Sequence, residues 1–259
     1  MTTLPLAHLD TLGLDELLAE AELLTRVDRK YLLDRREAAG VLHLLDPRTR
    51  VLAIDGRRRF RYESVYFDTP DLLSYRQAAL ARRHRFKVRT RSYLDTDLAF
   101  LEVKVRGSRD VTVKDRISYD PDSRARLTEL GRDYAGETLD ERGLDGSVAG
   151  ELEQTLLTRY ERVTLLPPEP GVRVTVDTDL SWTDGEGDLS LPDLVIVETK
   201  SGPHPSGIDR LLWRSGHRPE SVSKYGTGLA ALRGDLPANK WARILRRHFT
   251  TTKETPCAA

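Results

Sequence analysis

The sequence predicts an α+β protein built on an antiparallel sheet, and three observations support this. Strand patterns follow one another at 82–93, 97–106 and 109–119, and short polar turns join them as in a meander. Helical patterns come before, between and after the strands. The strands also carry charge on one face and apolar side chains on the other.

The charge pattern is clearest in the segment 85–91, where every second residue is basic. A strand places these cations, which include Lys87, Arg89 and Arg91, on one face and apolar residues on the other. A solvated outer face would explain one such strand. Apolar reverse faces, however, suit contact with covering helices, and the cations would then point inward.

Two further segments repeat the pattern. In 100–106 the charged face holds Glu102 beside Lys104, and 112–116 contributes Lys114. Inward cations lose hydration and repel one another, so they require a bound polyanion or interleaved carboxylates. Several such strands would line a cavity for a highly charged anion.

Before residue 82 the predicted elements are a helix at 14–24, a strand at 29–33, a helix at 36–45, strands at 50–55 and 59–68, and a helix starting near Thr69. Leucines at helical spacing support the first helix. Pro47 ends the second, since a residue before proline disfavours the helical conformation. Pro70 suits the first turn of the third, with Thr69 as its cap.

After residue 119 the predicted order is a mainly helical region at 122–165 with a glycine-rich loop near 142–150, strands at 171–181 and 192–201 around a turn at 184–188, and helices at 206–215, 224–233 and 238–249. The last helix is basic and amphipathic, and we expect Trp241, Ile244 and Leu245 to dock on the sheet. A membrane-surface role is the alternative. No linker composition divides the chain, so one domain over 1–259 is expected, with its core at about 20–235.

Composition excludes several classes of function. The chain has 259 residues with 41 basic and 41 acidic side chains, and this neutral balance argues against nucleic-acid binding. Its single cysteine, Cys257, cannot form an internal disulfide, which fits a reducing cytoplasm. No segment approaches the roughly 18 apolar residues of a membrane span, and the N-terminus lacks signal-peptide features. We therefore expect a cytoplasmic protein with no integral membrane segment.

Three more charged groups stand at the ends of predicted elements. Lys30 lies on the same strand face as Asp28. Glu198 and Lys200 follow an apolar run that should be buried, so they are expected to face a site. The third group is Ser223-Lys224 at a helix entry, where a lysine and free backbone amides suit a phosphate.

Short motifs along most of the chain resemble one family. In order they are Arg26-x-Asp28-x-Lys30-Tyr31, Ser64-Val65-Tyr66-Phe67-Asp68-Thr69, Lys87-x-Arg89-x-Arg91, Glu102-x-Lys104, Tyr160-x-Arg162, Arg173-x-Thr175-x-Asp177, Glu198-x-Lys200 and Ser223-Lys224-Tyr225. Each motif is short, but their shared order over about 20–235 resembles the VTC domain. This is the catalytic domain of vacuolar transporter chaperone polyphosphate polymerases, within the CYTH-like triphosphate tunnel metalloenzymes.

The resemblance implies an antiparallel β-barrel tunnel flanked by helices, with inward basic residues that hold phosphates. By motif position the implied phosphate contacts are Lys30, Arg89, Arg91, Lys104, Lys114, Arg162, Arg173 and Lys224, with Tyr160 joining them from a helix end. Lys30, Arg89 and Arg91 are expected to act in catalysis. The charge pattern adds Lys87, Lys200 and Ser223 as phosphate-binding residues.

The resemblance also implies a divalent metal, Mn²⁺ or Mg²⁺, held by Glu198. Glu102 is the only second metal carboxylate that the sequence offers. The implied substrates are ATP and inorganic polyphosphate or triphosphate, and a membrane or protein partner stays open. Related CYTH-type hydrolases begin with Glu-x-Glu-x-Lys, whereas this chain has Arg26-x-Asp28-x-Lys30, which fits the VTC branch better.

Three functions therefore compete. The first is a polyphosphate polymerase that transfers the ATP γ-phosphoryl group to a growing chain. Such transfer needs alignment and charge neutralisation more than a covalent nucleophile. The second is a metal-dependent inorganic or nucleoside triphosphatase, and the third is a non-catalytic polyphosphate-binding module.

Overall fold

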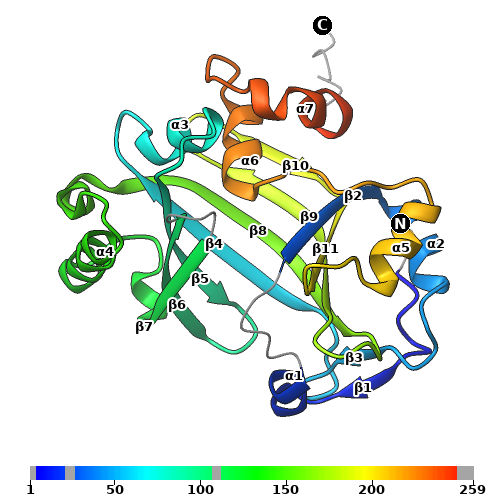
Figure 1. Cartoon of the computed structure of the whole chain (residues 1–259). Helices are drawn as coiled ribbons and strands as arrows, with labels where there is room; N and C mark the ends of the chain where they lie inside the picture. Colours follow the sequence, from blue (N-terminus) through cyan, green and yellow to red (C-terminus); the bar gives the residue numbers. More distant parts are fainter. Residues whose placement is uncertain (1–3, 21–26, 107–111, 250–259) are drawn as a thin grey trace, which may run out of the picture.

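The structure is a computed structural model that describes residues 4–20, 27–106 and 112–249 (Figure 1). Its strands are β1 (Asp10–Leu12), β2 (Val27–Asp34), β3 (Arg50–Leu52), β4 (Phe60–Asp68), β5 (Arg85–Tyr93), β6 (Leu98–Arg106), β7 (Thr112–Tyr119), β8 (Glu153–Leu166), β9 (Arg173–Thr183), β10 (Asp188–Leu191) and β11 (Leu194–Ser201). Its α-helices are α1 (Leu14–Glu20), α2 (Arg35–His43), α3 (Leu73–Ala79), α4 (Glu129–Glu141), α5 (Gly207–Arg214), α6 (Lys224–Leu232) and α7 (Ala242–His248). Short 3-10 helices are η2 (Pro121–Ser123), η3 (Gly146–Glu151) and η4 (Asn239–Trp241).

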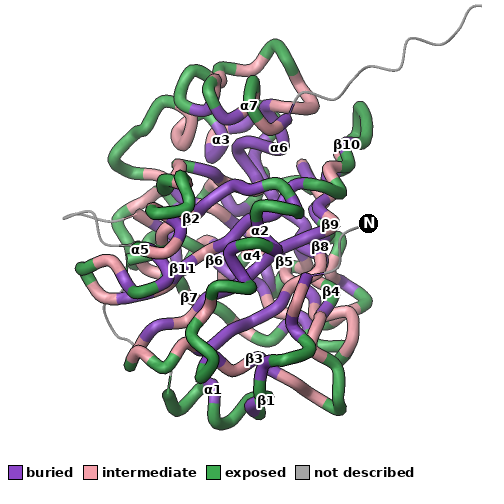
Figure 2. The backbone as a smooth tube through the Cα atoms, turned by 90° about the vertical axis from the view of Figure 1, so that its right-hand side faces the viewer, coloured by how far each residue is buried: buried purple, intermediate pink, exposed green. Residues whose placement is uncertain are grey.

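One sheet contains all the described strands. Its main order is β2-β11-β9-β8-β4-β5-β6-β7, and each neighbouring pair is antiparallel. β10 extends the sheet beside β9, and β3 joins β8 to the parallel strand β1. Buried residues are concentrated in the strands and in α6, whereas most exposed residues lie in loops and on the other helices (Figure 2). The α+β prediction is therefore confirmed.

The sheet curves strongly, so that distant strands face one another. The ammonium of Lys104 on β6 interacts electrostatically with Lys30 on β2 and Glu198 on β11, although five strands lie between β6 and β2 in the sheet order. We call the enclosed space between the facing strands the lumen. Within the described residues no ladder pairs the edge strands β2 and β7. The fold is the expected antiparallel tunnel, with one side left unpaired.

Period-two patterning explains why the basic faces turn inward at β5 and β6. The alternate residues Phe86, Val88, Leu101 and Val103 are buried in one cluster that includes Leu139 of α4. Figure 1 shows α4 against the outside of these strands. Because the apolar face packs on a helix, the cations between these residues face the lumen.

A second core covers the opposite wall. Tyr31, Leu33 and Val197 of β2 and β11 are buried with Leu42 of α2 and Leu212 of α5. In Figure 1 these two helices stand beside β2 and β11. Their burial fixes the alternate residues of both strands, including Lys30 and Glu198, on the lumen side.

The helices α6 and α7 pack against inner-face residues and so close part of one end. Leu32, Tyr66, Leu156 and Ile196 lie in a cluster with Tyr225 of α6. The expected docking of the C-terminal helix is also found, since Trp241 and Ile244 are buried and Leu245 packs partly against the same cluster. Within the described residues, no helix combines the length and apolarity that a membrane crossing needs.

The prediction for 122–165 was partly wrong. Residues 129–141 form the helix α4, but 153–166 form β8, the longest strand, between β4 and β9. Tertiary pairing determines that this segment is a strand, because both edges of β8 form backbone hydrogen bonds with the neighbouring strands β4 and β9. Tyr160 therefore reaches the lumen from the middle of a strand and not from a helix end.

Other differences are smaller. The short strands β1 and β10 were not predicted. The predicted cap at Thr69 is present, since the Leu73 amide donates to the Thr69 hydroxyl oxygen at 2.9 Å. The motif residue Arg26, the turn at 107–109 and Cys257 lie outside the described residues.

Substitution Gly228→Ala is expected to destabilise the protein. A Cβ at this α6 position would lie inside van der Waals contact of the buried Trp182 indole. Overpacking of this kind costs about 1–3 kcal/mol and outweighs the helix preference for alanine, about 1 kcal/mol. The matched control is Gly40→Ala in α2, where the Cβ meets nothing within 4 Å and should stabilise the helix. Urea denaturation measures both, and equal stability of the two variants would contradict the tight contact.

Candidate functional site

The lumen brings together the residues predicted from the sequence. They are Lys30 on β2; Lys87, Arg89 and Arg91 on β5; Glu102 and Lys104 on β6; Lys114 on β7; Tyr160 and Arg162 on β8; Arg173 on β9; Glu198 and Lys200 on β11; and Ser223 and Lys224 at the start of α6. The ladders align many of them directly, with Lys87 opposite Lys104 and Lys104 opposite Lys114. Like charges directly opposite destabilise a sheet, so this arrangement favours an anionic ligand.

Glu102 neutralises the first group of cations. Its carboxylate accepts two hydrogen bonds from Arg89, at 2.8 and 2.6 Å, and one from Lys114 at 2.9 Å, and Arg91 lies 3.9 Å away. Burial raises the pKa of Glu102, but Arg89, Arg91 and Lys114 lower it by more, so the carboxylate stays ionised. Arg89 also donates to the Tyr66 hydroxyl at 3.1 Å. Glu102 thus holds Arg89 in a fixed orientation.

Asp177 neutralises the second group, and sequence reasoning did not select it as a site residue. Arg162 donates to it through two nitrogens, at 2.6 and 2.8 Å, and Lys224 donates to the same carboxylate. Burial raises the pKa of Asp177, but Arg162 and Lys224 outweigh this effect and hold it at about 2. The sequence feature that could have identified Asp177 is its place in the motif Arg173-x-Thr175-x-Asp177.

Glu198 forms the third group, on the wall where the metal was expected. Its carboxylate accepts a hydrogen bond from Lys200 and lies 3.8 Å from the Lys30 ammonium, which stands opposite it in the ladder. Lys200 also lies 3.6 Å from Asp28. Burial raises the pKa of Glu198, but Lys30 and Lys200 lower it well below its ordinary value.

The charged forms of Lys87 and Lys104 are disfavoured by burial and by neighbouring cations. Lys87 donates to the Ser223 hydroxyl at 2.9 Å, and burial together with Lys104 and Arg89 lowers its pKa well below the ordinary value. Lys104 is open to the lumen but enclosed by the surrounding walls. This enclosure and the nearby Lys30 lower its pKa to about 8. Both ammonium groups would gain from a nearby anion.

Aromatic rings support several of the cations. Tyr160 is 3 % exposed and stacks on Tyr62, with centroids 5.3 Å apart. The Arg162 guanidinium lies 5.1 Å from the Tyr62 centroid, and the Lys224 ammonium lies 4.3 Å from the Tyr160 centroid. Such cation–π contacts contribute about 0.5–2 kcal/mol and fix the direction of each side chain.

Several buried polar atoms of the lumen have no hydrogen-bond partner. They are the hydroxyls of Ser64, Thr158, Tyr160 and Thr175 and the Nε of Arg91. Ser64 stands opposite both Arg91 and Thr158 in the ladders, so three of these groups are neighbours. Unsatisfied buried groups are costly, and their concentration here marks a position built for a polar ligand.

Tyr160 is the most informative of these groups. Burial raises the pKa of its phenol, but Arg91, Arg162 and Lys224 lower it by more, and the net pKa is below the ordinary value. A phenol surrounded by cations is a strong hydrogen-bond donor. Its hydroxyl is therefore suited to a phosphate oxygen.

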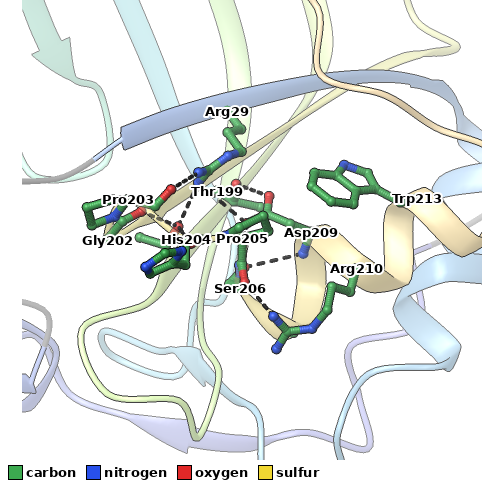
Figure 3. Close-up of polar contacts among 12 residues, drawn as sticks. Arg29, Thr199, Gly202, Pro203, His204, Pro205, Ser206, Asp209, Arg210 and Trp213 are labelled. Atoms are coloured by element: carbon green, nitrogen blue, oxygen red, sulfur yellow. Dashed lines mark hydrogen bonds and ion pairs between the residues drawn. The ribbon is translucent and has the colours of Figure 1, made fainter.

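A polar cluster on the outside of β11 provides a contrast (Figure 3). Asp209 of α5 is fully buried and accepts hydrogen bonds from Tyr31 at 2.7 Å, Thr199 at 2.6 Å and the Ser206 hydroxyl at 2.7 Å. These groups satisfy one another, and so the cluster attaches α5 to β2 and β11. The unsatisfied atoms of the lumen have no such structural explanation.

A divalent metal would need ligands beyond the protein. Among the described residues no group of three or more His, Cys, Asp or Glu side chains is arranged to hold an ion. A hard cation usually takes six or more oxygen ligands, whereas Glu198 offers one carboxylate. Phosphate oxygens could complete such a shell, so the donor set fits a metal bound together with a polyphosphate.

Comparison with known families agrees with this geometry. The model of the VTC domain matches residues 25–233 of the 259-residue chain. The chain belongs to the VTC domain family. The matched range of this VTC domain includes every lumen residue predicted above. No curated protein sequence matches the chain significantly.

Two solved structures align with the chain. The putative adenylyl cyclase HpAC1 from Hippeastrum, reported with a dominant triphosphatase activity, aligns with a TM-score of 0.53 and 17% identity over 83% of this chain and 99% of its own. A putative adenylate cyclase from Bacillus halodurans aligns with a TM-score of 0.46 and 12% identity over 76% of this chain and 93% of its own. At such identities the first likeness supports the tunnel fold of the VTC domain.

Polyanion affinity is expected to fall as the pH rises through about 8. In the empty lumen Lys104 has a pKa of about 8, because enclosure and Lys30 disfavour its charged form. A bound polyanion favours the ammonium, so above this pH binding must take up a proton. Calorimetric titration of tripolyphosphate in buffers of different ionisation enthalpy measures this uptake.

The control for this experiment is Lys104→Arg, since a guanidinium stays charged throughout the range. Its affinity should fall less between about pH 7 and about pH 9. The same fall in both proteins would assign the pH dependence to other groups.

Proposed function

We propose that this VTC domain is a polyphosphate polymerase, which transfers the γ-phosphoryl group of ATP to the end of a polyphosphate chain in the lumen. The observation that carries the proposal is the convergence of cations and unsatisfied donors from facing walls of one enclosed space. The family membership supports the same substrate class. Phosphoryl transfer in such a space depends on alignment and on neutralisation of charge.

The arginines have the geometry to align phosphates. Glu102 holds Arg89 and Asp177 holds Arg162, so both guanidinium planes are fixed before a ligand arrives. A fixed fork loses little entropy on binding and matches phosphate oxygens with two donors. Lys30 and Arg91 would add charge from facing walls, and Tyr160 would donate its free hydroxyl.

Glu198 is the residue proposed to hold Mn²⁺ or Mg²⁺ together with phosphate oxygens. Such an ion, when bound, would stabilise negative charge on the triphosphate. Lys30 and Lys200 would have to share the Glu198 carboxylate with it. Glu102 already has three cationic neighbours, and we assign it the positioning of Arg89 in preference to metal binding.

The acidic groups favour a phosphate acceptor over water. Glu102, Asp177 and Glu198 all have lowered pKa values because cations surround them, and this makes each a weak base. A phosphate acceptor is already ionised and needs no base, whereas water benefits from one. The triphosphatase alternative therefore lacks an evident water-activating group among these three carboxylates.

The test is to incubate the protein with ATP and Mn²⁺ or Mg²⁺ and to resolve the products by chain length. A ladder of polyphosphates together with ADP is expected. Orthophosphate as the only phosphate product would support the triphosphatase instead. Tight binding of ATP and polyphosphate without any product would support a binding module.

Lys30→Ala and Arg91→Ala are expected to abolish measurable turnover while the fold is kept. Each loses a charge-assisted contact worth about 1.5–3 kcal/mol, and if it strengthens in the transition state the rate falls roughly ten- to a hundredfold or more. Stability should hold or rise, because removal of one cation relieves repulsion in the empty lumen.

The matched control is Arg159→Ala, because Arg159 neighbours Tyr160 on β8 but faces outward to Glu63. Its turnover should be normal. Melting temperatures with and without tripolyphosphate separate binding from folding, since the lumen variants should gain less stability from the ligand. Normal activity and a normal gain in either lumen variant would place that residue outside the site.

Metal binding is expected to require phosphate. Wild-type protein should bind Mn²⁺ measurably only with tripolyphosphate present, since Glu198 alone offers too few oxygens. Glu198→Gln should reduce this joint binding, and the outward variant Glu161→Gln on β8, opposite the exposed Arg61, serves as the comparison. Calorimetric titration of Mn²⁺ with and without tripolyphosphate measures both, and tight binding to the protein alone would be the contrary result.

A further inference from the structure

One end of the lumen has partly exposed aromatic rings, whereas the rings near Lys87 at the other end, those of Tyr66 and Tyr225, are buried. Tyr93 and Leu98 stand opposite each other in the β5–β6 ladder, and Tyr62 of β4 is the next neighbour of Tyr93. Phe100 follows on the same face of β6. We call these four residues the aromatic mouth.

The aromatic mouth is only partly enclosed, although Tyr62 also packs against two of the hydrophobic clusters. Leu98 is 53% exposed, and Tyr62, Tyr93 and Phe100 are only partly buried. The rings still contact one another, with centroids 4.8 Å apart for Tyr62 and Tyr93 and 5.9 Å apart for Tyr93 and Phe100. Large apolar groups left accessible at the edge of a charged site are a usual sign of a ligand contact.

Two arginines lie beside the rings of the aromatic mouth. Arg91 stands opposite Phe100 in the ladder, and its guanidinium lies 6.0 Å from the Tyr62 centroid. The Arg116 guanidinium lies 4.6 Å from the Phe100 centroid. A flat aromatic ligand could stack on these rings while an attached phosphate met Arg91.

Lys87 lies near the other end of β5, away from the aromatic mouth. Lys87 lies six residues from Tyr93 on the same face, which is about 20 Å along a strand. There Lys87 and Lys104 are paired, both with lowered pKa values. The lumen therefore has a direction, from accessible aromatic rings at one end to the paired lysines Lys87 and Lys104 at the other.

We propose that the aromatic mouth binds the base of the donor nucleotide. The proposal rests on the proposed function and deepens it, because it gives the nucleotide one orientation. The base stacks on Tyr93 and Phe100, Arg91 contacts the adjoining phosphates, and the terminal phosphate points toward Lys87 and Lys104. The acceptor phosphate then lies on the lysine side of the bound nucleotide.

The experiment compares ATP with inorganic tripolyphosphate, which has the phosphates and no base. Binding of each to the whole chain is measured by calorimetry for wild type, Phe100→Ala and Tyr93→Ala. We expect wild type to bind both, and each variant to lose roughly tenfold in ATP affinity, as one lost base stack costs. Tripolyphosphate affinity should stay within about twofold, because its contacts are unchanged.

Two controls accompany the variants. Leu130→Ala removes an apolar side chain that is 70% exposed on α4, outside the lumen, and should alter neither affinity. Phe100→Leu keeps the bulk at that position and should also lose ATP affinity selectively. It replaces Phe100→Ala if that variant does not fold.

The outcomes separate the two proposals. Selective loss of ATP binding supports the aromatic mouth as the base site. Unchanged ATP binding, or equal losses for both ligands, overturns it while the polyanion site stands. If wild type binds neither ligand, the proposed function fails together with this inference.

Discussion

Enclosure of like charges is the constraint on which this structure depends. Folding brings lysines and arginines from facing strands into one space, where water cannot fully screen their repulsion. Three carboxylates, Glu102, Asp177 and Glu198, each contact two or more cations and lower the cost. Lys87 and Lys104 are left with lowered pKa values, so the empty protein is prepared for an anion.

The same constraint explains why the outside of the sheet is so well packed. Apolar residues alternate with the lumen cations on β5 and β6 and are buried against α4. Burial of one large apolar side chain contributes about 1.5–3 kcal/mol, which is the scale needed to offset an unfavourable polar position. The helices around the tunnel are thus part of the energetic basis of the site.

The sequence predicted strands and the direction of their side chains correctly where the alternation of residue types is regular. Strict alternation of charge in 85–91 predicted both the strand β5 and the direction of its side chains. The segment 153–166 lacks such regularity, since paired apolar residues interrupt its alternation, and it was predicted as helix. Its strand state comes from two long-range ladders, which no local pattern contains.

The counter-ions were less predictable than the cations. Asp177 is one of two acids on β9, and its partner Arg162 comes from the segment that was predicted as helix. Glu102 was predicted both as an acid among the cations and as a second metal carboxylate, and the convergence of three cationic neighbours on it forms only in the folded sheet. The aromatic mouth likewise joins residues from β4, β5 and β6 that share no motif.

The outward cluster around Asp209 has a consequence for the lumen. Tyr31 and Thr199, which it binds, are the chain neighbours of Lys30 and Glu198, so each strand is held from behind at the residue beside its functional one. The placement of the Glu198 carboxylate, the proposed metal ligand, therefore depends on the helix α5 on the outside of the sheet. Substitutions in α5 would therefore shift Lys30 and Glu198 from a distance. A designed protein that copied the lumen residues would keep their geometry only if it also copied the Asp209 cluster behind them.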